Sequence, residues 1–245
     1  MSTDKRKISV VIPVYNEENN LVPLYEKIKK VLTDLNRDYE IIFVDDGSKD
    51  KSGEVLRKIV DKDPYVKVVR LKRNYGQTFA LDAGFRNASG EIIISIDADL
   101  QNDPQDIPLL LKELEDSDVV CGWRRKRKDS FLKKISSFFA NSIRRFVLKD
   151  NIIDIGCTLR AYRREALEKI KLFNGMHRFL PILIAWEGFR IKQIEVRHHP
   201  RFSGKSKYGF YKRLTKSFFD LWAVFWMKKN WLRYEYEIIS KESTT

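Results

Sequence analysis

Short hydrophobic runs alternate with amphipathic segments through the first 120 residues of the chain. Runs rich in β-branched residues are typical of buried strands, and they occupy residues 8–13, 40–44, 66–71, 91–96 and 119–122. Hydrophobic residues at helical spacing lie between them, at 19–35, 53–60, 77–87 and 105–114. Asn16 is expected to cap the first of these helices. The alternation predicts an α/β fold with a mostly parallel sheet that helices cover on both faces.

Polar residues follow four of the predicted strands, in the segments PVYNE (13–17), DDGSKD (45–50), KRNYG (72–76) and DADLQ (97–101). Ligands of parallel sheets bind beyond the carboxyl ends of the strands. A single polar strand end is as easily a solvated loop, and DDGS alone is as easily a tight turn with a helix cap. Four such ends together predict a ligand site at this edge.

The DADLQ segment favours a metal ion. Residues i and i+2 of an extended chain project from one face, so Asp97 and Asp99 point together while Ala98 points away. Two adjacent carboxylates repel each other unless a cation lies between them, and oxygen ligands suit Mg²⁺ or Mn²⁺. Gln101 could add a neutral oxygen. An ion held here would bridge the phosphates of a nucleotide diphosphate and neutralise a departing diphosphate.

Two common nucleotide-binding motifs are absent, because the eleven glycines include neither G-x-G-x-x-G nor G-x-x-x-x-G-K. A dinucleotide dehydrogenase and a P-loop enzyme are therefore disfavoured. Asp45 and Asp46 could instead accept hydrogen bonds from a base N–H or from ribose hydroxyls, and Arg73 could reach the base or a phosphate.

The chain carries 47 Lys and Arg against 34 Asp and Glu, a formal charge of +13. This balance predicts an anionic partner: nucleic acid, an acidic membrane surface or a phosphorylated substrate. A nucleic-acid-binding module is disfavoured, because the acidic strand ends would repel a polyanion. Cys121 and Cys157 fit no metal-binding spacing, and we expect buried thiols.

Two segments are candidates for membrane contact, residues 131–148 and 211–231. The first has hydrophobic residues at helical spacing beside the bases Lys133, Lys134, Arg144 and Arg145; the second has an aromatic centre between basic flanks, with Trp222, Trp226 and Trp231 suited to a headgroup boundary. Burial of either helix against the domain is the alternative. The N-terminus lacks a signal-peptide pattern and no segment reaches the roughly 18–20 hydrophobic residues of a membrane span. We therefore expect a cytoplasmic protein that lies on the cytoplasmic face of an anionic membrane.

Four ordered segments carry a family resemblance: SVVIPVYNEENNL, FVDDGSKD, LKRNYGQTFALDAGF and DADLQNDPQDIP. Together they resemble inverting glycosyltransferases of family 2, which have the GT-A fold, over roughly residues 7–210. The DADLQ-x-D-P form is most similar to the polyprenyl-phosphate sugar transferases, the dolichyl-phosphate mannose synthase group.

The resemblance implies a role for each matching position. The nucleotide-sugar site would comprise Pro13, Tyr15, Glu17, Asp45, Asp46, Arg73 and Ala98, and the metal site Asp97, Asp99 and Gln101. The acceptor phosphate would be bound by Arg124, by Lys134 and Ser137 (or their neighbours Lys133 and Ser136), and by Arg201 and Lys207, with Ser206, of RFSGKSKYG. Asp97, Asp99, Arg124 and Arg201 would be the catalytic residues.

The implied reaction moves a sugar, mannose or glucose, from a GDP- or UDP-sugar to dolichyl or undecaprenyl phosphate with inversion. A lipid phosphate is already anionic, so alignment and charge compensation matter more than a strong base. The alternative is a family 2 enzyme that acts on a saccharide hydroxyl in polysaccharide synthesis. Processive synthases of that kind carry Q-x-x-R-W and several membrane spans, and this sequence shows neither.

The expected organisation is a catalytic domain over 1–210, with a nucleotide-sugar half (1–120) and an acceptor half (121–210), followed by an amphipathic helix and polar tail (211–245). Many relatives continue into transmembrane helices, so the protein is expected either to act peripherally or to need a membrane-embedded partner. Cys157 and Thr158 depart from the small-residue pattern of the family. His198 and His199 could approach the metal, and Asp103 is expected in a turn at a helix start.

Overall fold

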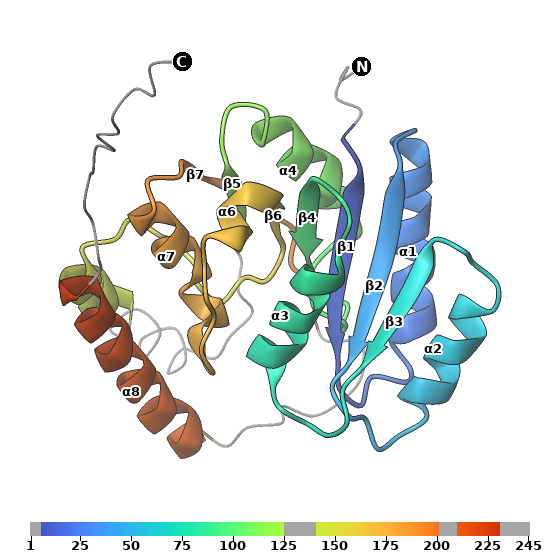
Figure 1. Cartoon of the computed structure of the whole chain (residues 1–245), viewed down its shortest axis with the longest axis horizontal. Coiled ribbons are helices and arrows are strands. Elements are labelled where there is room, and N and C mark those ends of the chain that lie inside the picture. Colours follow the sequence, from blue (N-terminus) through green and yellow to red (C-terminus); the bar gives the residue numbers. More distant parts are fainter. Residues whose placement is uncertain (1–5, 125–140, 201–209, 231–245) are drawn as a thin grey trace, which may run out of the picture.

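The computed structural model describes residues 6–124, 141–200 and 210–230, and gives 210–218 as backbone only. One sheet runs through it in the strand order β3-β2-β1-β4-β6-β5-β7 (Figure 1). Neighbouring strands are parallel except β6, which is antiparallel to both β4 and β5. The strands are β1 (Ile8–Val14), β2 (Tyr39–Asp45), β3 (Val66–Arg70), β4 (Ile92–Ser95), β5 (Val119–Trp123), β6 (Arg160–Arg163) and β7 (Ile191–Glu195).

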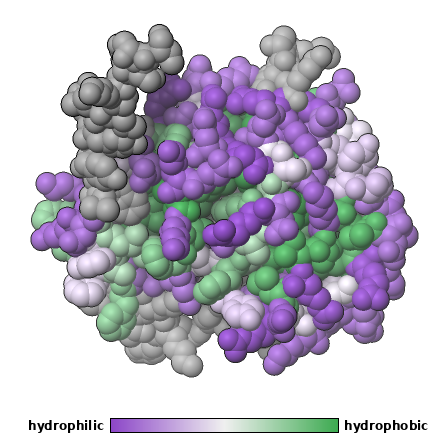
Figure 2. Space-filling view, viewed as in Figure 1, coloured by the Kyte–Doolittle hydropathy of each residue, from purple (hydrophilic) through white to green (hydrophobic). Residues whose placement is uncertain are grey.

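Helices cover both faces of the sheet because hydrophobic side chains alternate along buried strands. In β1, Val10 and Ile12 join the hydrophobic cluster on one face and Val11 joins the cluster on the other. The first face packs against α1 (Leu21–Asp34), α2 (Ser52–Val60), η1 (Pro104–Asp106) and α4 (Ile107–Glu113); the second packs against α3 (Gln77–Asn87), α6 (Arg164–Glu168) and α7 (Leu180–Trp186). On the face shown in the space-filling view, hydrophilic residues surround patches of hydrophobic residues (Figure 2).

A third hydrophobic cluster joins the C-terminal elements to the domain. The cluster contains Leu148 at the end of a helical stretch (141–148), Phe179 after η2 (Met176–Arg178), Leu183 of α7, and Val224 of α8 (Phe210–Lys229). Helix α8 therefore packs against α7 through one face. Within the described ranges, no helix has the length and hydrophobicity that crossing a bilayer requires.

The predicted α/β architecture is confirmed, and the nine predicted elements lie where expected, with ends shifted by a few residues. Strands β6 and β7 were not predicted, because their sequences, RAYR and IKQIE, are rich in charged residues. The cap prediction is wrong: Asn20, not Asn16, precedes α1. Asn16 has a φ of 54° and its Oδ1 accepts a hydrogen bond from the Lys49 N–H at 2.8 Å, which holds the loops after β1 and β2 together.

The amino ends of the strands are joined by a buried carboxylate, Glu40 of β2. Its Oε1 accepts hydrogen bonds from the Ser9 hydroxyl at 2.6 Å and from the backbone and hydroxyl of Ser89 at 2.6 and 2.7 Å. Lys67 of β3 forms an ion pair with Oε2 at 2.6 Å. Burial opposes ionisation, yet the hydrogen bonds from Lys67, Ser9 and Ser89 outweigh it and lower the pKa of Glu40 to about 2.

We predict that Glu40→Gln lowers the free energy of unfolding by about 2 kcal/mol at pH 7, because charged hydrogen bonds are lost from a buried site. The pKa of Glu40 in the folded protein lies below its usual 4.5, so this stabilisation is complete above that pH and is lost as the pH falls toward 2. Urea unfolding at a series of pH values measures it.

The matched control is Asp82→Asn, which breaks the exposed ion pair with Arg86 at 2.8 Å. This variant should stay within about 0.5 kcal/mol of the wild type. Equal stability of Glu40→Gln and wild type at pH 7 would contradict a stabilising role for this network.

Candidate active site

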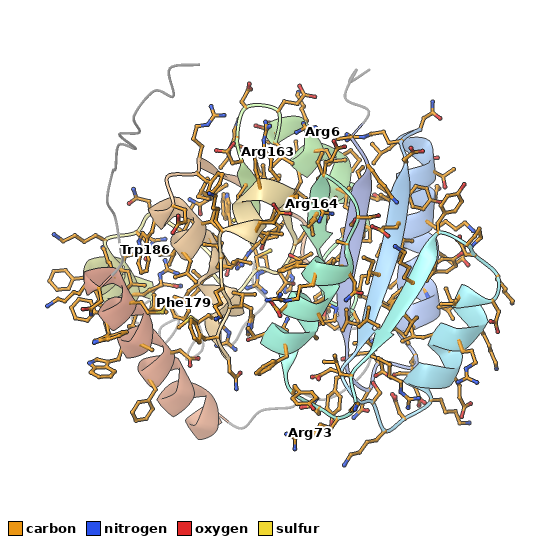
Figure 3. The ribbon with its side chains drawn as sticks, in the orientation of Figure 1. Arg6, Arg73, Arg163, Arg164, Phe179 and Trp186 are labelled. Carbon is orange, nitrogen blue, oxygen red and sulfur yellow. The ribbon has the colours of Figure 1, made fainter. Side chains whose placement is uncertain are left out.

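The carboxyl ends of β1, β2 and β4 meet at one edge of the sheet, and the first residue of β6 lies there too. Because β6 runs antiparallel, Arg160 is paired in register with Ser95, the last residue of β4. Arg73, after β3, lies at this edge in Figure 3, whereas Arg163 and Arg164 lie toward the opposite end of the sheet. The topology therefore brings the predicted strand-end residues together.

Asp45 has one carboxylate oxygen at this edge that accepts no hydrogen bond from the described part of the chain. The side chain is 1% exposed, and its Oδ1 accepts a hydrogen bond from the Ser48 N–H at 2.9 Å. Its Oδ2 is buried, accepts no hydrogen bond from the described residues, and lies 3.6 Å from Arg70 Nε in a weak ion pair. Buried carboxylate oxygens are rarely left without a donor, so Oδ2 suits an N–H or hydroxyl of a ligand.

Both carboxylate oxygens of Asp46 accept hydrogen bonds from the loop after β3. Its Oδ1 accepts a hydrogen bond from the Tyr75 N–H at 2.7 Å, and its Oδ2 accepts from the Gly76 N–H at 2.8 Å and the Asn74 side chain at 2.9 Å. Burial raises the pKa of Asp46, and the backbone hydrogen bonds partly offset this effect. Asp46 therefore holds the loop after β3 in place, including Arg73, whose guanidinium lies 4.9 Å from the Tyr75 ring centroid.

The loop after β1 forms a wall beside Asp45. Tyr15 and Glu17 of this loop are half-buried, and so is Pro13 near the end of β1. The Glu17 N–H donates to Ser52 Oγ at 2.9 Å, and one oxygen of Glu17 accepts from the Asn20 side chain at 2.6 Å. The loops after β1 and β2 are thus joined by hydrogen bonds, and together they provide a preformed surface.

The acidic pair Asp97 and Asp99 follows β4. Gln77, the first residue of α3, donates a hydrogen bond to Asp97 Oδ1 at 2.7 Å. Asp99 is 8% exposed, and its Oδ1 accepts from the Gln101 N–H at 3.1 Å. Leu100 between them has a φ of 59°, a conformation that costs a branched residue on the order of 1–2 kcal/mol. The turn is therefore held in a strained conformation that keeps both carboxylates at the sheet edge.

The groups around this pair shift the pKa of Asp97 in opposite directions. Burial and the nearby charge of Asp99 raise the pKa of Asp97 to about 6. A hydrogen bond from Thr158 and the positive charges of Arg124 and Arg160 act in the opposite direction. A site in which two carboxylates resist full ionisation is one that a cation would stabilise.

The residues present fit a divalent ion of the Mg²⁺ type. In the described ranges, no three His, Cys, Asp or Glu side chains gather closely enough to enclose an ion. Mg²⁺ commonly takes one or two protein carboxylates and completes its shell with phosphate oxygens and water. Asp97 and Asp99 would supply that pair, with Gln101, which is half-buried, beside them.

The His199 ring contacts Asp103, which lies beyond the acidic pair along the chain. His199 Nε2 lies 3.0 Å from Asp103 Oδ2, and the backbone of His198 bridges to Asn102. Asp103 Oδ1 accepts from the Gln105 N–H at 3.0 Å and caps η1, as predicted.

Two arginines face the acidic pair from the acceptor half. Arg124 follows β5 and forms a two-point ion pair with Asp154, at 2.7 Å from Nε and 3.0 Å from Nη2. Arg160 is 3% exposed and donates to the carbonyl oxygens of His177 at 3.0 Å and Ile155 at 2.7 Å. The arrangement sets two positive charges close to two negative ones.

Several of these residues were missed by sequence reasoning. Arg160 was hidden because β6 was not recognised, and Asp154 lies in a loop without a motif. Thr158 was noted only for its departure from the family pattern, without a role in the site. Gln77 stands directly after KRNYG at a predicted helix start, which was a usable signal. Seven of the predicted acceptor-side residues lie outside the described residues: Lys133, Lys134, Ser136, Ser137, Arg201, Ser206 and Lys207.

Comparison with known proteins identifies the family. A family model described as Glycosyl transferase family 2 matches residues 9–171. The chain belongs to glycosyl transferase family 2. The resemblance expected from the four motifs is thus confirmed.

Two bacterial relatives illustrate the sequence similarity. Dodecaprenyl-phosphate galacturonate synthase of Rhizobium johnstonii is 40% identical over 224 residues, which cover 89% of this chain and 66% of the relative. Undecaprenyl-phosphate 4-deoxy-4-formamido-L-arabinose transferase of Proteus mirabilis is 42% identical over 225 residues, covering 90% and 69%. The family 2 chain described here therefore spans about two thirds of the length of these relatives.

Solved structures show the same fold. A mannosyltransferase from Pyrobaculum calidifontis in complex with GDP-Man and Mn²⁺ superposes with a TM-score of 0.69 at 22% identity, covering 91% of this chain and 64% of that one. Glucosyl-3-phosphoglycerate synthase from Mycobacterium tuberculosis in complex with Mn²⁺ and UDP-Glc gives a TM-score of 0.68 at 20% identity, covering 91% and 79%. The GT-A fold expected for this family 2 protein is confirmed.

Gly47 tests how closely the strand-end loops must approach. Its φ is +68°, and a Cβ there would lie 2.5 Å from the backbone carbon of Arg73. We predict that Gly47→Ala lowers the free energy of unfolding by about 3 kcal/mol, because strain and a backbone clash add. Thermal or urea unfolding measures the loss.

Gly188, after α7, supplies the matched control. Its φ is +88° but a Cβ there meets nothing within 4 Å, so Gly188→Ala should cost only the conformational strain of about 1 kcal/mol. Equal losses in the two variants would show that contact between the loops after β2 and β3 is unimportant.

Proposed function

We propose that this family 2 protein transfers a sugar, with inversion, from a nucleoside diphosphate sugar to a polyprenyl phosphate. One observation carries the proposal: an acidic pair, the half-buried Asp97 and the buried Asp99, lies within electrostatic reach of the clamped Arg124. This opposition of charge suits a metal-bound diphosphate on one side and an anionic acceptor on the other. The polyprenyl-phosphate names of the two relatives at 40% and 42% identity support the acceptor class.

The nucleoside half of the donor is assigned to the loops after β1 and β2. Asp45 Oδ2 accepts an N–H or hydroxyl of the nucleoside, since it is buried and none of the residues in 6–124, 141–200 and 219–230 donates to it. Pro13, Tyr15 and Glu17 supply the adjoining wall, and Arg73 is exposed at the rim. Asp46 contributes by fixing the loop that carries Arg73.

The diphosphate half is assigned to Asp97 and Asp99, which would hold Mg²⁺ or Mn²⁺ with Gln101 beside them; Ala98 is 3% exposed and packs in the core cluster. When bound, the ion offsets the charge that develops on the departing diphosphate. Gln77 fixes the orientation of Asp97 through its 2.7 Å hydrogen bond. Ion complexes of neighbouring GT-A structures, at or below 22% identity, support a divalent ion.

The acceptor side is assigned to Arg124, with Lys134, Ser137, Arg201 and Lys207 retained as predictions. A polyprenyl phosphate is ionised at neutral pH, so its oxygen can attack the anomeric carbon without a strong general base. The arginine then orients the phosphate and offsets its charge as it approaches the diphosphate. This reaction therefore requires positively charged side chains on the acceptor side, and it does not require a carboxylate that acts as a general base.

A surface beside the acceptor half suits a membrane. Phe219, Trp222 and Trp226 of α8 are 68%, 62% and 58% exposed, whereas Val224 faces the core. Phe146, on the adjacent helical stretch, is 85% exposed. We infer that these aromatic side chains enter the interface of an anionic membrane, with the exposed Lys229 at the end of α8 as a basic contact.

Two parts of the earlier expectation change. Arg144 does not serve as an exposed basic contact, because it is 2% exposed and pairs with Asp150 at 3.1 Å. Trp231 lies outside the described residues. The cytoplasmic face, the membrane-embedded partner and the separation of 1–210 from 211–245 remain proposals.

A donor panel tests the function. Membrane lipid extract or undecaprenyl phosphate is incubated with Mn²⁺ and radiolabelled nucleotide sugars: mannose and glucose donors, and donors of the galacturonate and 4-deoxy-4-formamido-L-arabinose named in the relatives. We expect label from one donor in a mild-acid-labile lipid. Asp99→Asn should lower the rate by on the order of 10²–10³ because it removes a charge from the diphosphate site.

Transfer to a saccharide hydroxyl, with none to lipid phosphate, would contradict the acceptor assignment. Lack of transfer from every donor to any lipid phosphate would contradict the proposed reaction. Full activity of Asp99→Asn would remove that residue from the site.

Vesicle flotation tests the membrane surface. The double variant Trp222→Ala/Trp226→Ala should bind vesicles that contain anionic lipid about tenfold or more weakly, because two indole rings no longer leave water. Wild-type binding should also weaken as salt is raised. Tyr65→Ala is the matched control, since Tyr65 is 55% exposed just before β3, and it should bind like the wild type. Equal binding of all three proteins would argue against this surface.

A further inference from the structure

A short loop before β6, residues 154–158, touches both sides of the site. It lies between the helical stretch 141–148 and β6, and it contains Cys157 and Thr158, the pair that departs from the family pattern. Its first residue contacts the acceptor-side arginine, and its last contacts the turn that carries the acidic pair. The same few residues thus reach two groups that must act together.

At the first end, Asp154 fixes the plane of Arg124. It accepts hydrogen bonds from Nε at 2.7 Å and Nη2 at 3.0 Å, and the Gly156 N–H donates to Asp154 Oδ1 at 3.0 Å. Both side chains of the ion pair are 11% exposed. A guanidinium has five N–H groups, so this pairing leaves the Nη1 side and one Nη2 hydrogen for an anionic ligand.

At the other end, three side chains form a directed series of hydrogen bonds. The Cys157 thiol lies 3.7 Å from Asn102 Oδ1, which orients the amide so that its Nδ2 donates to Thr158 Oγ1 at 3.1 Å. Thr158 Oγ1 thereby holds Asn102, a residue of the turn that carries the acidic pair. Ser95 donates to the Thr158 carbonyl oxygen at 2.6 Å and fixes the backbone there.

We propose that residues 154–158 form a bracket in which Thr158 positions the turn that carries Asp97 and Asp99, and Asp154 positions Arg124, so that one segment sets the spacing between donor diphosphate and acceptor phosphate. This rests on the proposed function, because it assigns those two phosphates to Asp97 and Arg124. Thr158 and Asp154 are positioning residues, since each acts through its partner. The Cys157–Thr158 pair thus has a structural role, because both side chains contact Asn102 in the turn after β4.

The geometry gives a reason for such a bracket. The two substrates must meet with the attacking phosphate oxygen aligned on the anomeric carbon, and small displacements are costly. Hydrogen-bonding partners of metal-binding carboxylates typically contribute about 10–100-fold to metal affinity. Loss of the Thr158 hydroxyl should therefore be seen first in metal binding, and loss of the Asp154 charge first in acceptor use.

The Thr158 end is tested with Mn²⁺ alone as the probe, titrated in the presence of excess UDP or GDP and followed by the electron paramagnetic resonance signal of free Mn²⁺. Thr158→Val keeps the shape and removes the hydroxyl, and it should weaken Mn²⁺ binding about tenfold or more. Thr158→Ser keeps the hydroxyl and should bind within about twofold of the wild type. Wild-type Mn²⁺ affinity in Thr158→Val would overturn the bracket. Where Thr158→Val lowers the melting temperature in EDTA, Thr158→Ala carries the same test.

The Asp154 end is tested with undecaprenyl phosphate as the varied substrate. Asp154→Asn should raise the KM for the lipid phosphate about tenfold or more, because Arg124 loses its charged clamp, while the Mn²⁺ affinity with nucleotide stays at the wild-type value. A purely structural role would move both quantities, so equal effects on both, or on neither, would overturn the bracket. A wild-type protein that fails to bind Mn²⁺ with either nucleotide, or to use lipid phosphate, would overturn the proposed function and the bracket with it.

Discussion

Mutual repulsion between Asp97 and Asp99 is the constraint around which the site is built. The fold holds both at the end of a buried strand, in a turn whose central residue, Leu100, has a φ of 59°. Left alone, such a pair would take up a proton, and burial together with Asp99 does raise the pKa of Asp97 to about 6. The protein keeps the pair by surrounding it with donors and positive charge, which leaves the remaining charge deficit to a ligand.

The sheet topology supplies much of that compensation. A fully parallel sheet would direct the last residue of each strand to the ligand edge, but β6 is reversed and directs its first residue there. Arg160 thus lies beside Ser95, the last residue of β4, whereas Arg163 at the other end of the strand lies toward the opposite end of the sheet (Figure 3). Arg124 arrives from the end of β5, which pairs with β6 on the other side. One reversed strand therefore brings a buried arginine to the acidic pair and lies between the donor and acceptor halves.

The sequence predicted the donor half well because its signals are local. Buried parallel strands such as β1 and β2 are continuous hydrophobic runs, and the polar ends after them stand out against those runs. The acceptor half depended on long-range pairing: Arg160 and Thr158 gain meaning only from contacts with residues more than 50 positions away. Asp45 and Asp46 were predicted as equivalent, yet one has a vacant oxygen and the other holds a loop. Adjacent identical residues on a strand end face opposite ways, and only packing shows which one meets the ligand.

The position of α8 links this chemistry to a surface. Val224 buries one face of the helix against the cluster that contains Phe179. Phe179 directly follows η2 (Met176–Arg178). The carbonyl oxygen of His177, in η2, accepts a hydrogen bond from Arg160. The opposite face of α8 carries Phe219, Trp222 and Trp226 into solvent. A lipid acceptor presents its phosphate only at the membrane boundary, so an enzyme of this kind must hold its acceptor-side arginines at a fixed height above that boundary. Under the proposed function, the packing of α8 on the elements that support Arg160 would meet this requirement.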